Sequence, residues 1–403
     1  LTFGYTMIVA ETAIGRMTRK SPVGAFKSFG KKKWLSFGGW INAVIPVLIV
    51  PYYSVIGGWV IKYLVEYFRG NAKLLAEDGY FTDFISNGVS TELCFVAFCA
   101  FTLIIIFAGV QNGIERVSKI MMPILIVLSV IIAVYSVTRP GALAGVKYFL
   151  VPNVKNFSWM TVVSAMGQMF YSLSIAMGIL ITFGSYMKKD TAIEDSTRNV
   201  EVFDTGIAIM AGLMIIPAVF AFSGGDPDTL QAGPSLMFIT IPKVFQNMGF
   251  GTVIGIVFFL LVLFAAVTSS IALTESAVST FEDELGWGRK KATVLVGVIM
   301  LALGSLSSLG YGPLAGIKII GMQFLDLFDF LTNSVMMPIA ALLTSLLVSR
   351  VVGIDKIEEE IIHGESAFRR KKVFVVMIKY LCPVFAIIIL LSSVANALGW
   401  IKM

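Results

Sequence analysis

Residues 167–178 of this 403-residue chain read Gly167-Gln168-Met169-Phe170-Tyr171-Ser172-Leu173-Ser174-Ile175-Ala176-Met177-Gly178. They lie in the middle of an apolar segment, residues 158–187, that is long enough to cross the roughly 30 Å hydrocarbon core of a bilayer. Glycines, serines and a glutamine are thus concentrated where a bilayer is most apolar. Either small residues let two helices pack closely here, or the helix is broken and its free backbone groups bind ions and substrate.

A second apolar segment, residues 249–281, favours the broken-helix interpretation. Its centre contains three adjacent hydroxyl residues, Thr268, Ser269 and Ser270. Hard cations prefer oxygen ligands, and hydroxyl and carbonyl oxygens provide them for sodium without adding charge to the membrane interior. Hydroxyl groups can also bond to carbonyls of their own helix, so a purely structural role remains the alternative.

The composition of the whole chain is that of a membrane protein. Hydrophobic residues make up 57% of the chain, charged residues only 14%, and the mean hydropathy is +0.86. A soluble domain carries close to a quarter of charged residues. Apolar runs predict an opening span that ends at Gly15-Arg16 and further spans near residues 40–69, 91–109, 115–138, 158–187, 195–222, 249–281, 291–309, 320–349 and 373–399. We expect an all-α bundle, because a backbone in lipid must satisfy its own hydrogen bonds.

The predicted spans form a single transmembrane domain over residues 1–403. Because the chain opens inside an apolar segment and without an initiator methionine, we expect one further helix to precede it in the intact protein. Residues 223–248 contain an apolar run, 233–242, that is too short to span a bilayer. We expect residues 223–248 to form an extracellular cap loop over the mouth of the bundle.

The formal net charge of +6 reports membrane orientation rather than a nucleic-acid partner. Most of the 31 lysine and arginine residues follow alternate spans, which places those loops in the cytoplasm and the protein in the inner, or plasma, membrane. The three cysteines lack metal-site spacing, and the one histidine, His363, lies in a charged loop. No nucleophile and base stand together in the sequence, so we predict that the protein is not an enzyme.

Four acidic residues fall within apolar segments: Glu11, Asp204, Glu275 and Asp329. A carboxylate at the bilayer centre costs at least about 2.5–3.5 kcal/mol, so it usually faces a cavity and a partner. These acids are therefore candidates for a functional site.

Several short motifs of this sequence occur together, in the same order and spacing, in one family. Over essentially its whole length the chain resembles the neurotransmitter:sodium symporter family, in its bacterial amino-acid transporter branch. The matching motifs are Glu11-x-x-x-Gly15-Arg16, Pro51-Tyr52-Tyr53, Gly113-Ile114-Glu115-Arg116, Gly167-Gln168-x-Phe170, residues 233–242, and Thr268-Ser269-Ser270 followed by Glu282-Asp283-Glu284. The resemblance implies an inverted-repeat bundle with broken helices, ten of about eleven being present here, and sodium-coupled symport of a neutral amino acid into the cell.

The resemblance also implies two Na⁺ sites in the intact protein. Ala265, Thr268 and Ser269 match ligands of the second site. Ser172 matches a ligand of the first, and Asp204 aligns with an asparagine ligand of that same site. A carboxylate there would supply the negative charge that chloride supplies in animal members. We therefore predict chloride-independent transport, with proton counter-transport through Asp204 as an open possibility.

The substrate residues follow from the same resemblance. Tyr53 matches the tyrosine whose hydroxyl holds the substrate carboxylate. The residues that would line the side-chain pocket are Ile49, Ile56, Tyr171, Ser174, Met177, Ser270 and Leu273. Most of this lining is apolar, so we expect a hydrophobic or aromatic amino acid. Glu11, Gln168 and Asp329 match a polar gate network, with Asp329 as the acid of the external gate.

Other functions remain open on sequence grounds. In a proton-coupled amino-acid permease of similar architecture a basic side chain tends to replace the sodium-binding hydroxyls, so Thr268 and Ser269 disfavour that alternative. A channel or a non-transporting substrate sensor on the same scaffold is a second alternative, although the sequence shows no channel filter. The expected partners are the amino acid, sodium ions and the lipid bilayer, with the oligomeric state left open.

Overall fold

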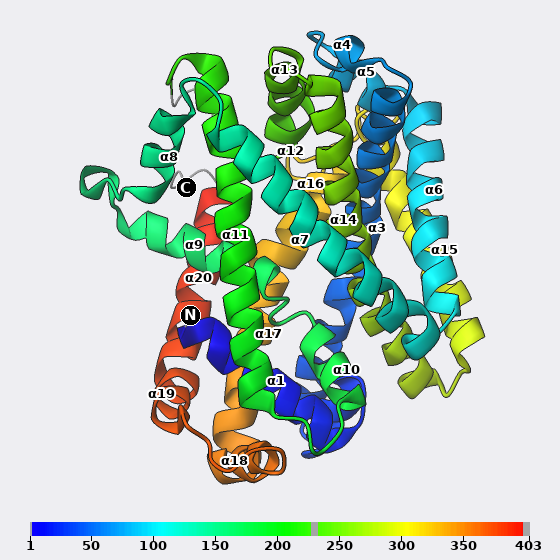
Figure 1. Ribbon diagram of the computed structural model, residues 1–403. Helices are drawn as coiled ribbons and strands as arrows, with labels where there is room; N and C mark the ends of the chain where they lie inside the picture. The colour runs from blue at the N-terminus through cyan, green and yellow to red at the C-terminus, as the bar shows by residue number, and fades with distance from the viewer. Residues whose placement is uncertain (1, 227–232, 398–403) are drawn as a thin grey trace.

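The computed structural model describes residues 2–226 and 233–397, and helices are the dominant regular structure in these two ranges (Figure 1). Eight helices or unbroken helical runs are long and apolar enough to cross a bilayer. They are α3 (Lys33–Phe68), α6 (Gly88–Phe107), η1–α7 (Val110–Val137), α11 (Ile193–Ser223), α14 (Gly251–Leu285), α15 (Arg289–Leu309), the run from α16 through η5, α17 and η6 (Phe324–Val352), and the run from α19 through η7 to α20 (Lys371–Ala397).

Two further membrane elements complete the ten predicted spans. Helix α1 (Thr2–Thr18) opens the described chain, and the segment 158–187 contains α9 (Trp159–Ser172) and α10 (Ile179–Tyr186). The all-helical fold with a broken helix is therefore confirmed. Helix α3 begins at Lys33, one to two turns before the predicted boundary, because hydropathy marks the lipid-embedded part of a helix and not its continuation into polar surroundings. Residues 398 and 399 of the last predicted span lie outside the described residues.

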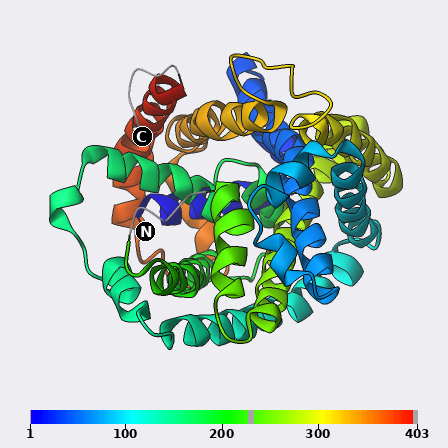
Figure 2. The same ribbon diagram turned by 90° about the horizontal axis from the view of Figure 1, so that it is seen from above.

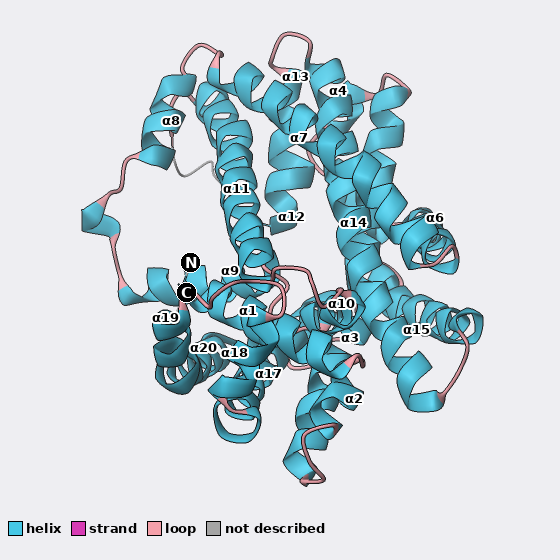
Figure 3. Ribbon diagram, turned by 60° about the horizontal axis from the view of Figure 1, so that its bottom comes forward, coloured by secondary structure: helices cyan, strands magenta, loops and turns pink. Residues whose placement is uncertain are grey.

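Short helices lie at the two ends of the bundle (Figure 1). One end carries α4 (Ala72–Leu75), α5 (Tyr80–Ser86) and α13 (Ile241–Gln246). The opposite end carries α18 (Ile354–Ile362) and, as Figure 3 shows, α2 (Pro22–Lys27). This second end holds most of the basic loops and is the predicted cytoplasmic end. Helix α8 (Ala142–Leu150) lies against α11.

Several of the long helices pack directly against one another. Helix α3 contacts α6, α14 and α15, while α11 contacts α7 and α1 packs against α10. Seen along the bundle, the described helices form a ring of spans with α1 inside it (Figure 2). Of the two halves of the broken helix, α10 contacts α1, α14 and α2, whereas α9 contacts α20 and η5.

Two glycines join α1 to α10 by backbone contact. A Cβ atom at Gly15 would lie 2.0 Å from the carbonyl oxygen of Ile181, and one at Gly184 would lie 2.6 Å from that of Thr12. Small residues allow this close approach of membrane helices. We therefore treat α1 and α10 as one rigid pair.

This contact predicts that Gly15→Ala destabilises the protein, because the added methyl group forces α1 away from α10. Overpacking of this kind costs about 1–3 kcal/mol. Thermal unfolding of the full-length protein in detergent should therefore occur at a lower temperature. Gly167→Ala in α9 is the matched control, since a Cβ there meets nothing within 4 Å. Equal unfolding temperatures for the two variants would contradict the close contact.

Candidate functional site

The break between α9 and α10 has a specific backbone conformation. Ser174, Ala176 and Gly178 all have positive φ angles, +54°, +57° and +70°. The left-handed region costs a non-glycine residue roughly 1–2 kcal/mol and does not continue a right-handed helix. The helical pattern of hydrogen bonds ends here, because the N–H groups of Ser174 and Ile175 donate to the carbonyls of Tyr171 and Phe170, three and five residues back, as the broken-helix interpretation predicted.

Glu11 of α1 binds one backbone N–H group of the break. The backbone N–H of Ala176 donates to its carboxylate at 2.8 Å, and the side chain is fully buried. The second carboxylate oxygen of Glu11 has no hydrogen-bond partner among the described residues. Gln168, predicted to belong to the same network, lies on α9 with an exposed side chain. Among the described residues, no hydrogen bond joins Gln168 to Glu11.

Ser172 and Asp204, predicted as ligands of one sodium ion, are brought together. Ser172 is the last residue of α9, and its hydroxyl donates directly to the Asp204 carboxylate on α11. The Ser172 side chain is exposed and Asp204 is half-buried, so neither is sealed in a dry helix contact. The pair places a charged oxygen and a neutral one beside the break.

The residues predicted to bind the second sodium ion lie on α14, away from the Ser172–Asp204 pair. Ala265, Thr268 and Ser269 are three and four residues apart, which places them on one face of the helix. The Thr268 hydroxyl donates to the carbonyl of Ala265 at 3.0 Å and to that of Phe264 at 3.1 Å. Ser269 is exposed, and its side chain lies near the phenol of Tyr53. The oxygens predicted for the second ion are therefore clustered, although Thr268 also makes the back-bond of the structural alternative.

Ser270 points elsewhere. It is fully buried, and its hydroxyl lies 3.1 Å from that of Thr102 on α6. It therefore takes part in the contact between α14 and α6. The remaining predicted lining residues come from α3, α9, the break and α14. Of these, Ile49, Met177 and Leu273 are buried, whereas Ile56, Tyr171 and Ser174 are half-buried.

A tyrosine–aspartate cluster joins three segments near the break. The hydroxyls of Tyr52 and Tyr171 each lie 3.1 Å from the same carboxylate oxygen of Asp329, and they contact each other directly. The Tyr52 hydroxyl also lies 3.3 Å from that of Thr332. Sequence reasoning identified Tyr171 and Asp329 but missed Tyr52 and Thr332. The adjacent pair Tyr52-Tyr53 was the available signal, because neighbouring helical residues face different partners.

The fourth acid in an apolar segment, Glu275, lies outside this site. Its carboxylate is 2.6 Å from the guanidinium of Arg289, and it accepts a hydrogen bond of 2.7 Å from Tyr186. Glu275 is thus a buried ion-pair partner between α14 and the start of α15.

The predicted cap segment packs on the opposite end of α3 from the basic loops. In its described part, α12 (Gly233–Ser235), η4 (Leu236–Thr240) and α13 follow one another. The Tyr63 hydroxyl donates to the Phe238 carbonyl at 2.7 Å, and the Phe238 ring stacks on that of Phe81. Lys243 of α13 pairs with Asp78, and this hydrogen bond and charge lower the pKa of the Asp78 carboxyl. Residues 227–232 of the predicted cap loop lie outside the described residues.

A membrane bundle with a helix broken at its centre and oxygen ligands around the break has the architecture of a secondary transporter. The family model for the sodium:neurotransmitter symporter family matches residues 66–399. The chain belongs to the sodium:neurotransmitter symporter family. It is a multi-pass membrane protein and a sodium-dependent transporter, not an enzyme.

Individual relatives agree with this assignment. The uncharacterised sodium-dependent transporter YhdH of Bacillus subtilis is 32% identical over 398 residues, which cover 98% of this chain and 87% of that protein. A sodium-dependent transporter of Haemophilus influenzae is 30% identical over 410 residues, covering 98% and 88%. The crystal structure of MhsT in complex with L-phenylalanine superposes with a TM-score of 0.86 at 32% identity, covering 98% of this chain and 89% of that one.

Proposed function

We propose that this transporter couples the downhill entry of sodium to the uptake of a small neutral amino acid with a hydrophobic or aromatic side chain. The observation that carries the proposal is the pairing of Ser172 with Asp204 at the end of α9, beside a backbone that leaves its helical conformation. A site of this kind binds ions and substrate at the same place, which is what coupling requires.

Two groups of oxygens would hold the transported sodium ions. The Ser172 hydroxyl and the Asp204 carboxylate would bind one ion between α9 and α11. The Ala265 carbonyl and the hydroxyls of Thr268 and Ser269 would bind a second ion on α14. Because the first group joins two helices, an ion bound there favours the arrangement in which these helices are close, and it thereby stabilises the substrate-loaded state.

The same break would bind the substrate. The Tyr53 hydroxyl is suited to a carboxylate, and Ile49, Met177 and Leu273 are suited to an apolar side chain. MhsT, the similar structure, was solved with L-phenylalanine, which supports a hydrophobic or aromatic substrate here. Asp329, with Tyr52 and Tyr171, would form the polar gate on the cap side of the substrate.

The negative charge of Asp204 would make transport independent of chloride. A sodium ion in a low-dielectric site needs a compensating charge close by, and the Asp204 carboxylate beside Ser172 would provide one. Replacing chloride by an impermeant anion should therefore leave the rate of uptake unchanged.

Uptake by the full-length protein in proteoliposomes tests the proposal. We expect an inward sodium gradient to drive accumulation of labelled phenylalanine and leucine, with little uptake of aspartate or lysine. Uptake driven by a pH gradient and indifferent to sodium would instead support a proton-coupled permease. Binding of the amino acid without uptake under either gradient would support a substrate sensor.

A further inference from the structure

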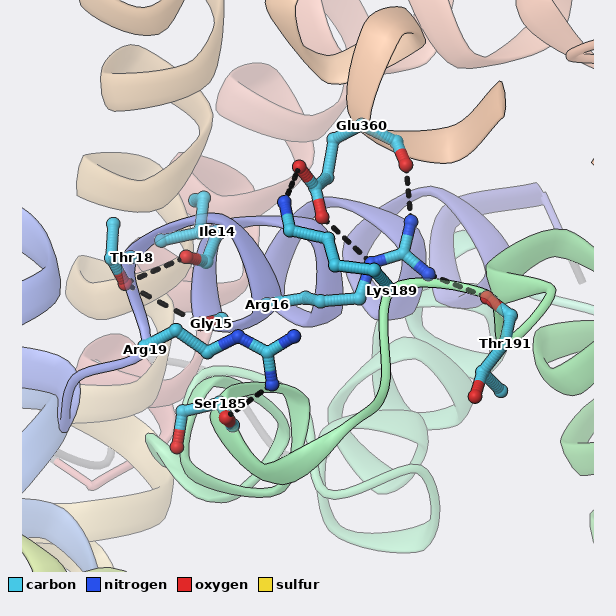
Figure 4. Close-up of polar contacts among 9 residues, drawn as sticks. All are labelled: Ile14, Gly15, Arg16, Thr18, Arg19, Ser185, Lys189, Thr191 and Glu360. Atoms are coloured by element: carbon cyan, nitrogen blue, oxygen red, sulfur yellow. Dashed lines mark hydrogen bonds and ion pairs between the residues drawn. The ribbon is translucent and has the colours of Figure 1, made fainter. Parts of the chain in front are cut away.

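A second polar cluster lies at the predicted cytoplasmic end of the bundle, and its centre is the fully buried side chain of Arg16 (Figure 4). The Arg16 Nε donates to the Glu360 carboxylate at 2.7 Å. Its two Nη atoms donate to the backbone carbonyls of Thr191 and Glu360. The Lys189 ammonium lies 2.6 Å from the other Glu360 carboxylate oxygen. One carboxylate of α18 therefore binds α1 and the connection between α10 and α11.

The segments that Glu360 holds are also joined directly to one another. Helix α1 packs on α10 through Gly15 and Gly184. Arg19, just after α1, donates to the carbonyl of Ser185 near the end of α10 at 3.0 Å (Figure 4). Arg16 also links α1 to the segment after α10, because its guanidinium donates to the Thr191 carbonyl. A displacement of α10 must therefore carry α1 with it.

Two reciprocal caps attach the residues after α18 to the start of α11. The Glu194 carboxylate accepts the backbone N–H groups of Arg369 and Arg370 at 2.8 and 2.9 Å. In return, the Glu365 carboxylate accepts the backbone N–H groups of Glu194 and, at 3.4 Å, Asp195. Carboxylates at helix N-termini are stabilising. Residues 354–371, which we name the clamp, thus hold the broken helix and its neighbours at two points.

The clamp opposes one specific movement. At its buried face α10 meets α14, where the Thr182 and Ser276 hydroxyls are 3.2 Å apart. Helix α10 follows the break and contacts α14, so we take its separation from α14 as the movement that would open a path to the cytoplasmic end. Resting on the proposed transport function, we propose that the clamp holds the α1–α10 pair closed and that Glu360 is the positioning residue that fastens it.

Charge burial explains why Glu360 favours the closed position. Arg16 is 0% exposed and Glu360 is 4% exposed, so removing the carboxylate charge leaves a buried guanidinium poorly compensated. Once α1 and α10 move away from α18, water solvates Arg16, and losing the Glu360 charge then costs less free energy. Neutralising Glu360 therefore destabilises the closed position more than the open one.

Thiol accessibility of the full-length protein tests the clamp. A Thr182→Cys reporter is introduced after Cys94, Cys99 and Cys382 are replaced by alanine. We expect Glu360→Gln to raise the rate of reporter alkylation about tenfold, within the usual range of such couplings, and we expect sodium to reduce the rate. Glu358→Gln is the matched control, because it makes the same change on α18 in a half-buried pair with Lys371. Equal rates in the two variants would overturn the clamp.

Two further measurements separate clamping from a general loss of stability. Thr102→Cys reports on the buried contact of α6 with α14, and its alkylation should not change in Glu360→Gln. Faster alkylation of both reporter cysteines in Glu360→Gln would mean that Glu360 has a purely structural role. If Glu360→Gln does not fold, Lys189→Gln is the second variant, because Lys189 is 50% exposed and its removal is milder. We expect it to raise the alkylation rate of the Thr182→Cys reporter about two- to threefold. An unchanged alkylation rate would contradict the clamp. The proposed function is judged separately by sodium-driven uptake of the unmodified transporter.

Discussion

Replacement of both Thr268 and Ser269 by alanine abolishes sodium-stimulated uptake at ordinary sodium concentrations. The two hydroxyls lie on one face of α14 beside the Ala265 carbonyl, and Thr268 Oγ1 is 3.0 Å from that carbonyl oxygen. A hydrogen bond or ligand contact to a charged group contributes about 1.5–3 kcal/mol. Losing two of them should lower the apparent sodium affinity at least about 100-fold, because 1.4 kcal/mol corresponds to a factor of ten.

The measurement is initial uptake by the full-length protein as a function of sodium concentration. Thr280→Ala is the matched control, since Thr280 lies on the same helix and its hydroxyl bonds to the Ser276 carbonyl at 2.9 Å. The control should keep the wild-type sodium dependence. A double variant with unchanged sodium dependence would show that these hydroxyls serve only as helix back-bonds, like the one that Thr268 makes in the structure.

The location of the broken helix was predictable from sequence, but its conformation was not. Glycines and serines at mid-membrane marked the segment as either a close helix contact or a broken helix, and the hydroxyl residues of segment 249–281 favoured the second. The left-handed residues in the break include Ser174 and Ala176, for which local propensity predicts ordinary helix. Tertiary contacts hold them there, including the hydrogen bond from the Ala176 N–H to Glu11, 165 residues away.

The contents of the site were predictable only in part, because sequence does not define how each helix is rotated. The structure brings Ser172 and Asp204, predicted as ligands of one sodium ion, into direct contact. Ser270 was expected in the pocket, and its hydroxyl instead faces Thr102. One helical residue turns a side chain by about 100°, so an adjacent position in an otherwise correct motif can belong to a different contact.

Arg16 shows a second limit of sequence reasoning. It counted among the basic residues that define the cytoplasmic side, where a charge normally stays in water. The structure buries it against Glu360, which is 344 residues further along the chain. The positive-inside pattern predicts the side of the membrane on which a charge lies, but it contains no information about which distant carboxylate will pair with it.

Replacement of Asp204 by asparagine should strongly weaken sodium binding, because it removes the only charge of the Ser172–Asp204 pair while preserving its shape. Two unit charges 4 Å apart interact by about 4 kcal/mol at an effective dielectric constant of about 20. Part of this energy offsets the desolvation of the carboxylate, so we expect the apparent sodium affinity to fall by at least about tenfold. A mobile anion can then supply the missing charge, and chloride should partly restore uptake by this variant.

Sodium titrations in chloride and in gluconate measure both effects on one preparation. The wild-type protein should give the same curve in the two salts, whereas Asp204→Asn should give a lower affinity in gluconate than in chloride. Asp195→Asn is the matched control on the same helix, because Asp195 is half-exposed and pairs with Arg369 at 3.4 Å, away from the break. A wild-type rate that falls when chloride is removed would mean that Asp204 does not carry the compensating charge, since a carboxylate already in place leaves no role for a second anion.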